Sequence, residues 1–277
     1  MAYRKFHKLI GDIEWEFKEE GKKVHTEKWQ AVDIGDNPAA QMVEILHHSF
    51  HYDISNDIEN LKKAIKPNLP WAENHFQERI CGEPINPGVE WANWPWGNSA
   101  DNHRDQNGQF NHNYMERYWP KYAGFTGDGK LSKGFEFEDD VGANYGIRHE
   151  YGDLGNLINL LIKEPTTRQA YLPIWFPEDT GDVHGGRKPC TLGYHFIVRD
   201  GEIDITYYIR SCDYVRHFRD DVYLTIRLLH HVLEECRKAN PVQWRDIKPG
   251  KLVMHITSLH IFINDYINLF GEAPNGK

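Results

Sequence analysis

The residues best suited to chemistry are a cysteine and an arginine at the outer ends of two neighbouring strand-like runs. Cys190 opens one apolar run, and Arg210 and Ser211 close the next. Arg199-Asp200-Gly201 between them predicts a tight hairpin turn, so the outer ends of the two strands should meet. An arginine beside a thiol lowers the pKa of the thiol and can also bind phosphate. The sequence therefore predicts a nucleophilic cysteine next to an anion site.

Three other side chains are candidates for proton handling or anion binding. Glu73 lies about one turn from Phe76 in a helix predicted over 71–80, and a carboxylate near apolar surface has a raised pKa that suits proton transfer. A solvated helix glutamate is the alternative. Tyr114 could relay a proton through its hydroxyl or could simply pack, and Arg168, at a strand entrance, could clamp an anion or remain solvated.

A tryptophan group lies in the irregular stretch 84–113. Trp91, Trp94 and Trp96 could form a stacking wall for a ring-shaped ligand, a sugar-binding surface or a local core. Long irregular segments inside compact domains are usually functional or disordered. The three interpretations stay open at this point.

Length and composition favour one soluble domain over 1–277. Hydrophobic residues make up 40% and charged residues 26% of the 277 residues, as in ordinary globular proteins. A formal net charge of -9, with no stripe of Lys and Arg, argues against direct nucleic-acid binding. No apolar run reaches the roughly 18 residues of a membrane-spanning helix, so no membrane association is expected.

The four cysteines follow no zinc-binding spacing, and the sixteen histidines contain no His-Glu-x-x-His pattern. We therefore expect no metal. No signal-peptide pattern precedes the cysteines, which favours reduced thiols in a cytoplasm.

The elements that must position these residues follow from periodicity and turn residues. Asp220 is a good N-cap for a helix whose apolar face carries Val222, Ile226, Leu229, Leu233 and Cys236. Segment 123–147 is expected to be a surface excursion. The remaining predicted helices are 39–48, 54–65 and one that starts at Gly152-Asp153 and ends near Pro165. The predicted strands are 170–175, 192–198, 203–210 and 252–263.

Four motifs in this order make the chain resemble the thymidylate synthase superfamily. They are an Arg-x6-Trp strand (Arg168 to Trp175), Pro189-Cys190, Arg-Ser-x-Asp (Arg210 to Asp213) and His260-Ile261-Phe262. The resemblance runs from about Trp71 to Tyr266. It implies an α+β fold in which a large mixed sheet is flanked by helices, with two sheets packed back to back in a homodimer.

The resemblance also implies a reaction. Cys190 would add to C6 of a pyrimidine nucleotide, and C5 would then attack the methylene group of 5,10-methylenetetrahydrofolate, the expected co-substrate. The family also implies that Arg210 and Ser211 bind the 5′-phosphate together with Arg168 of the partner subunit. It implies a catalytic glutamate at Glu73 and a proton-relay tyrosine at Tyr114. Asp213 and Trp94 would contact the folate, and His260 would contact the sugar.

The departures from the family pattern bear on the substrate. Thymidylate synthases have asparagine where this chain has Asp221, and a carboxylate is the better acceptor for the amino group of cytosine. Ser211 keeps the pattern associated with deoxyribonucleotides, whereas Gln169 replaces a phosphate arginine and Phe262 a sugar-contacting tyrosine. No counterpart of the family's N-terminal arginine loop is visible. An acidic helix start, stabilised by the helix dipole, is the plain alternative for Asp221.

Asp221 therefore favours dCMP, as in the family's phage-type dCMP hydroxymethylases. The expected product is 5-hydroxymethyl-dCMP, formed when water captures the one-carbon unit after transfer. Reductive methylation of dCMP, or action on dUMP, is the close alternative. A non-catalytic nucleotide or sugar binder built around the tryptophans is the distant one.

Overall fold

The structure is a computed structural model that describes residues 2–29, 32–86, 88–94, 104, 108–110, 113–122, 151–181 and 187–274. Its sheet contains β1 (Ala2–Tyr3), β2 (Lys22–Val24), β5 (Met42–Asp53), β6 (Tyr171–Pro173), β7 (Thr191–Arg199), β8 (Glu202–Asp213) and β9 (Lys248–Phe262), and β3 (Lys28–Trp29) and β4 (Val32–Asp33) form a separate ribbon. The helices are α1 (Phe6–Glu19), α2 (Ile58–Ile65), α3 (Trp71–Arg79), α4 (Val89–Ala92), α5 (Tyr114–Tyr118), α6 (Leu154–Lys163), α7 (Phe218–Ala239), α8 (Pro241–Trp244) and α9 (Ile263–Phe270).

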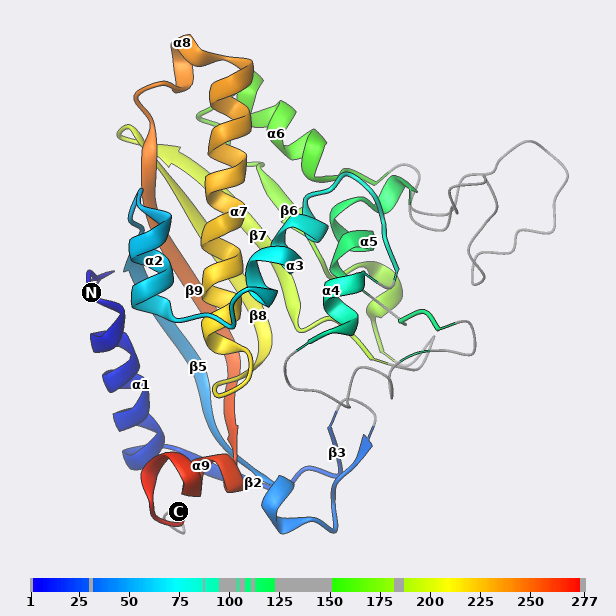
Figure 1. The fold of residues 1–277 in the computed structure, drawn as a ribbon, viewed down its shortest axis with the longest axis vertical. Coiled ribbons are helices and arrows are strands. Elements are labelled where there is room, and N and C mark those ends of the chain that lie inside the picture. Colours follow the sequence, from blue (N-terminus) through cyan, green and yellow to red (C-terminus); the bar gives the residue numbers. More distant parts are fainter. Residues whose placement is uncertain are drawn as a thin grey trace, which may run out of the picture.

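The seven-stranded sheet is mixed, in the order β1-β5-β9-β8-β7-β6, with β2 also paired to β5. β8 and β9 run parallel. The pairs β5–β9, β7–β8 and β6–β7 are antiparallel. Helix α7 crosses the centre of one face, with α1, α2, α3 and α6 around it (Figure 1). The expected α+β fold with a mixed sheet flanked by helices is thus confirmed.

Helix α7 fixes the core. The five residues of its predicted apolar face are all buried, as expected. The predicted N-cap is wrong, however, because the helix begins at Phe218 with His217 as its N-cap residue. Asp220 lies inside the first turn, where its carboxylate accepts hydrogen bonds from the backbone N–H and side-chain amide of Asn68, at 2.8 and 2.7 Å.

The β7–β8 hairpin has the predicted turn. Asp200 and Gly201 both adopt positive φ, 53° and 77°, which is the backbone of the tight turns that match the twist of a hairpin. Ile209 pairs with Thr191, and the backbone N–H of Arg210 donates to the carbonyl of Cys190 at 2.9 Å. The hairpin therefore brings the cysteine and the arginine together at one end of the sheet.

The helix predicted over 39–48 is wrong, since this segment begins the long strand β5. His47, at a φ of 57°, has no partner in the register between β5 and β9, where Leu46 pairs with Ser258 and His48 with Ile256. Thr257 of β9 is likewise unpaired, and the register is the same on both sides of this position, so no residue is inserted into either strand. Val43 and Ile45 are buried before the left-handed backbone of His47, and Phe50 and Tyr52 are buried after it. The alternation of buried and exposed positions therefore changes phase within the strand, and a single period of two is lost from the sequence.

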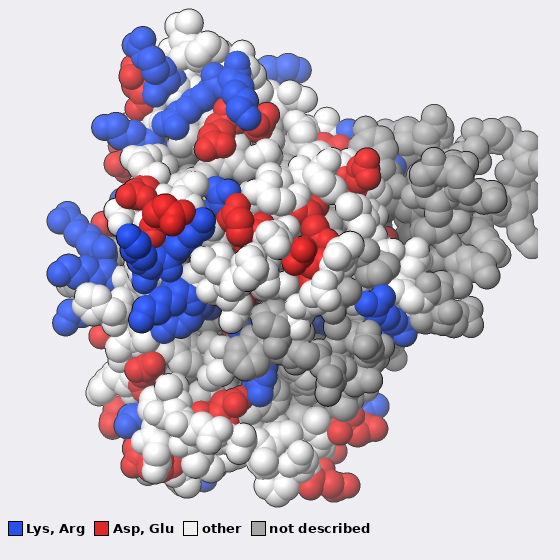
Figure 2. Space-filling model, viewed as in Figure 1, with Lys and Arg blue, Asp and Glu red and all other residues white. Residues whose placement is uncertain are grey.

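The opposite face of the sheet carries no described helix and is partly apolar. Leu46 is 52% exposed and Tyr171 is 42% exposed, and the rings of Tyr208 and His255 stack 5.4 Å apart. On the helix-covered face, acidic and basic side chains are interspersed (Figure 2).

Two sequence predictions lie outside the described residues, namely the surface excursion 123–147 and the position of Trp96. No helix among the described residues is both long enough and apolar enough to cross a bilayer.

Candidate active site

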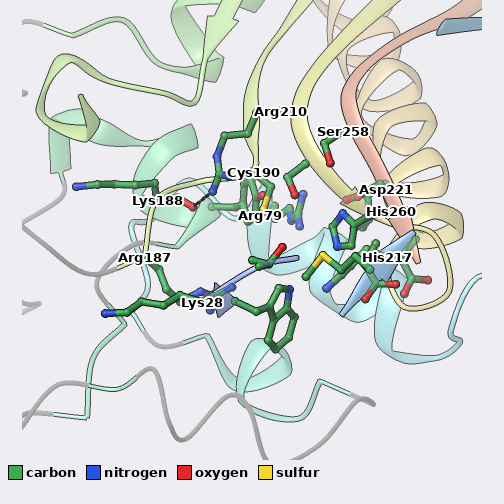
Figure 3. A pocket seen from close by; sticks show the side chains of 18 of the residues that line it. Lys28, Arg79, Arg187, Lys188, Cys190, Arg210, His217, Asp221, Ser258 and His260 are labelled. Atoms are coloured by element: carbon green, nitrogen blue, oxygen red, sulfur yellow. Dashed lines mark hydrogen bonds between the residues drawn. The ribbon is translucent and has the colours of Figure 1, made fainter. Parts of the chain in front are cut away.

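A cavity of about 240 Å³ lies where β7, β8 and β9 approach α3 and the start of α7. Figure 3 shows its side chains converging from these elements and from the ribbon that carries Lys28. Its lining contains seven of the predicted site residues: Tyr114, Cys190, Arg210, Ser211, Asp213, Asp221 and His260. His260, the seventh, closes the far side on β9.

Arg210 shapes the backbone that leads into Cys190. Its Nε donates to the carbonyl of Pro189 at 2.9 Å, and one terminal nitrogen donates to the carbonyl of Lys188 at 3.0 Å. With the bond from its own N–H to the carbonyl of Cys190, the arginine contacts three consecutive residues. The guanidinium that lines the cavity therefore fixes the backbone that leads into Cys190.

Burial raises the pKa of the Cys190 thiol, and the neighbouring charges of Arg210 and Arg187 only partly oppose this effect. The lowered pKa expected from Arg210 alone is therefore not what the structure shows. The two guanidinium groups still favour the thiolate relative to a cavity without them.

Asp221 is a partly buried acid in the wall of the cavity. Burial raises its pKa to about 7, against the lowering effect of the Arg79 charge. Its Oδ2 accepts a weak hydrogen bond from the Cys212 thiol at 3.6 Å. No hydrogen bond to its Oδ1 is found among the described residues, so that oxygen can accept one from a ligand.

Arg79 is a cavity residue that the sequence did not predict. It is only 4% exposed, and its guanidinium lies 4.1 Å from the centroid of the Tyr114 ring. Its Nε donates to Nε2 of His75 at 3.0 Å, so Nδ1 of His75 carries the proton and faces Glu78 at 3.2 Å. A short chain of hydrogen bonds thus fixes a buried cation beside the cavity.

Tyr114 stands where a relay residue could act. Its hydroxyl lies 3.0 Å from Oγ1 of Thr191, the residue that follows Cys190. Burial raises the pKa of Tyr114 to about 12, and the proximity of Cys190 adds to this effect. The tyrosine is therefore a neutral hydroxyl at physiological pH.

The far wall combines Asp213, His217 and His260. Asp213 accepts from the backbone N–H groups of Val215 and Arg216, both at 3.0 Å, which fixes the turn before α7. His260 is 5% exposed, and its Nε2 has no hydrogen-bond partner among the described residues. Because buried polar atoms normally have a hydrogen-bond partner, this ring nitrogen is suited to bind a polar group of a ligand.

Trp94 lies behind this wall and is not among the lining residues. Its ring stacks on His217, with centroids 4.7 Å apart and planes 11° from parallel. His217 itself lines the cavity, and burial lowers its pKa to about 4, so it is neutral. The tryptophan supports a lining residue in this arrangement.

Glu73 is not brought together with Cys190. Its carboxylate binds Arg227 through two hydrogen bonds of 3.0 and 2.8 Å and accepts a third from the Tyr223 hydroxyl at 2.6 Å. Burial raises the pKa of Glu73, but these bonds outweigh burial and bring the pKa to about 2. A carboxylate held in this way is an anion at physiological pH, and it joins α3 to α7.

Arg168 is also outside the cavity. It is exposed just before β6, and its carbonyl is 3.0 Å from Nε2 of His195. Gln169 is likewise exposed beside it. Neither side chain reaches the cavity of its own chain.

Several further cations and aromatic residues line the cavity. Arg187 and Lys188 directly precede Pro189-Cys190, and proximity in sequence was a signal that could have identified them. Lys28 and Trp29 come from the short ribbon, and Trp71 comes from the start of α3. Nothing in their local sequence marks these three. Among the described residues, no cluster of metal-ligating side chains occurs.

Comparison with known proteins agrees with this geometry. A family model described as thymidylate synthase matches residues 88–270, and the chain belongs to that family. A putative thymidylate synthase of Methanosarcina barkeri is 26% identical over 158 residues, which cover 55% of this chain and 65% of the relative.

Other similar proteins are thymidylate synthases of Lactococcus lactis subsp. lactis and of Enterobacteria phage T4. The first is 29% identical over 157 residues, 54% of this chain and 50% of the relative. The second is 26% identical over 129 residues, 45% of this chain and 41% of the relative. The chain thus spans less than two thirds of these curated relatives.

The ion pair of Glu73 predicts a pH-dependent stability effect. We expect Glu73→Gln to lower the free energy of unfolding at pH 7 by about 1 to 2 kcal/mol. The pKa of Glu73 is lower in the folded protein than in the unfolded chain, so the ionised carboxylate stabilises the fold at any pH above the unfolded-state pKa. This difference should shrink as the pH falls from about 5 toward 2. Urea unfolding of wild type and Glu73→Gln between pH 7 and pH 2 measures the difference. The control is Glu59→Gln, which removes an exposed ion pair with Lys62.

Proposed function

We propose that this protein transfers the one-carbon unit of 5,10-methylenetetrahydrofolate to C5 of dCMP, through an adduct with Cys190, and that water capture gives 5-hydroxymethyl-dCMP. The observation that carries the proposal is that Asp221, an acid and not an amide, lies in the same cavity as Cys190 and Arg210. This assigns the enzyme to the folate-dependent transferases that act on pyrimidine nucleotides.

Base selection follows from the acceptor on Asp221. The amino group at C4 of cytosine donates a hydrogen bond, and acidic side chains accept from that group in DNA recognition. Oδ2 of Asp221 already accepts from Cys212, which leaves Oδ1 for the base. Uracil presents an oxygen at the same position, and an acceptor facing an acceptor is unfavourable.

The nucleotide would lie with its phosphate toward Arg210 and Ser211. An arginine that already binds two backbone carbonyls is rigid, and a rigid guanidinium recognises phosphate well. His260, whose buried Nε2 has no partner among the described residues, would bind a sugar hydroxyl at the other side of the cavity.

The co-substrate would occupy the side of the cavity that contains aromatic rings. Trp29 and Trp71 line it, and indole rings suit a flat, conjugated ring. Asp213 lines the same cavity with a carboxylate fixed by the turn it caps. Trp94 would contribute through the orientation of His217.

The proposed assembly is a homodimer with its sheets back to back. The uncovered face carries exposed Leu46 and Tyr171 and the stacked pair Tyr208 and His255, which is apolar enough to form an interface. Arg168 is exposed at the sheet edge and outside its own cavity. It would bind the phosphate in the partner subunit.

Reductive methylation is the second candidate, because the relatives named above are thymidylate synthases. That reaction would use the same Cys190 adduct, but its products would be a methylated nucleotide and dihydrofolate. Both candidates need the same described residues.

Product analysis separates the two candidates. dCMP, dUMP and CMP are each incubated with the protein and methylenetetrahydrofolate, and the nucleotide mass is measured together with dihydrofolate absorbance. We expect a hydroxymethyl product from dCMP without dihydrofolate, and Cys190→Ser should form no product because serine is a much weaker nucleophile. Dihydrofolate in stoichiometric amount would establish methylation instead.

Replacing Asp221 should change the preferred base. We expect Asp221→Asn to shift the ratio of kcat/KM for dCMP over dUMP toward dUMP by about tenfold or more, the equivalent of one good hydrogen bond. Asp220→Asn is the matched control, since the neighbouring carboxylate binds Asn68 and should not change the ratio. Equal ratios in wild type and Asp221→Asn would contradict base recognition by Asp221.

The shared site predicts complementation between two inactive variants. We expect Cys190→Ser and Arg168→Ala each to have little activity alone, and an equimolar mixture refolded together to recover about a quarter of wild-type activity. Half of the dimers would be mixed, and each mixed dimer would have one intact site. A mixture without recovered activity, at a concentration where sedimentation shows dimers, would rule out a contribution of Arg168 across the interface.

A further inference from the structure

A chain of three hydroxyl groups runs from the cavity wall into the core. The Tyr114 hydroxyl lies 3.0 Å from Oγ1 of Thr191, and that oxygen lies 2.8 Å from the hydroxyl of Tyr207. Thr191 and Tyr207 are each 1% exposed. Of the three, only Tyr114 lines the cavity.

The elements that carry the chain are rigid. Thr191 is the first residue of β7 and follows Cys190 directly, while Tyr207 lies in the centre of β8 and stacks on Tyr194 with ring centroids 4.9 Å apart. Tyr114 is the first residue of α5, and the guanidinium of Arg79 lies over its ring. Each oxygen therefore has a fixed position, and the middle one belongs to the residue that directly follows Cys190.

Such a chain can run in either of two directions. If Tyr207 donates to Thr191 and Thr191 donates to Tyr114, the Tyr114 O–H points into the cavity as a donor. If Tyr114 donates to Thr191, its lone pairs face the cavity as acceptors. A threonine oxygen between two phenols is what allows both directions, because a hydroxyl donates once and accepts twice.

We propose that Thr191 and Tyr207 are positioning residues that set the hydrogen-bond direction of Tyr114 during the reaction at Cys190. The inference rests on the proposed function, in which a hydrogen at C5 must leave the base and Tyr114 faces the reacting nucleotide. The two residues act only through Tyr114, and neither touches the substrate.

The cost of burying the three hydroxyls supports this role. Phe at 207 and Val at 191 would fill the same space without any buried polar atoms, and an unsatisfied buried hydroxyl is costly. Burial raises the pKa of Tyr207 well above its ordinary value, so this tyrosine stays neutral and keeps its hydrogen for the chain.

The first test compares Thr191→Val with Thr191→Ser. Release of tritium from C5 of labelled nucleotide follows the reaction whichever one-carbon product forms. We expect Thr191→Val to lower kcat by about tenfold or more with KM for the nucleotide changed less than about twofold, because orientation of a proton-transfer group affects the transition state. Thr191→Ser keeps the hydroxyl and should remain within about threefold of wild type.

Tyr207→Phe is the second variant and does not alter the cysteine loop. It should lower kcat by about threefold or more at unchanged KM, since Thr191 then loses one partner. Wild-type kcat in both Thr191→Val and Tyr207→Phe would overturn the proposal. An equal loss in Thr191→Ser and Thr191→Val would also overturn it, because the hydroxyl would then not be the cause.

A measurement on the free protein separates this inference from the proposed function. With tyrosine labelled by carbon-13 at Cζ, the Tyr114 resonance is assigned by its absence in Tyr114→Phe. Thr191→Val should shift this resonance and that of Tyr207, and Thr191→Ser should leave both near their wild-type positions. Unshifted resonances in Thr191→Val would contradict the hydroxyl chain. Absence of tritium release from dCMP, dUMP and CMP by wild type would contradict the proposed function alone.

Discussion

The candidate site depends on how Arg210 holds the segment that precedes Cys190. The guanidinium binds the carbonyls of Lys188 and Pro189, and the backbone of Arg210 binds that of Cys190. A cysteine at the start of an edge-proximal strand would otherwise have a mobile thiol. The same cation faces the cavity, so the position of the nucleophile and the affinity for an anion depend on one side chain. In the proposed reaction, phosphate binding and the order of Cys190 are therefore coupled.

Charge balance in the cavity follows from burial. Arg79 is buried and Asp221 is partly buried, and neither has an oppositely charged partner within 4 Å among the described residues. Each charge is partly compensated through space by the other, which keeps the pKa of Asp221 from rising further than about 7. An acid with a pKa of about 7 beside a fixed cation is a group whose protonation responds strongly to small changes in the hydrogen bonds around it.

Local sequence could predict the parts of the site that one hairpin brings together. The turn Arg199-Asp200-Gly201 and two strands of similar length were enough to place Cys190 beside Arg210. The change of phase in β5 at His47 and the pairing of Glu73 with Arg227 could not be predicted in this way, because each depends on a partner far away in sequence. Arg79 was hidden for the same reason, since only the packing of α3 on α7 and α5 makes it part of the cavity.

Helix α3 shows why the type of a residue is a weak guide to its role. Its sequence offers Glu73 near apolar residues, but a helix turns about 100° per residue, so Glu73 and Arg79, six positions apart, project in directions that differ by more than 90°. The first meets α7 and the second meets the cavity. A buried arginine fixed by His75 and stacked on Tyr114 then acts on the hydroxyl next to Cys190. Glu73 is thus an ion-pair partner of α7, whereas the tyrosine at the cavity lies between a cation and a chain of hydroxyl groups.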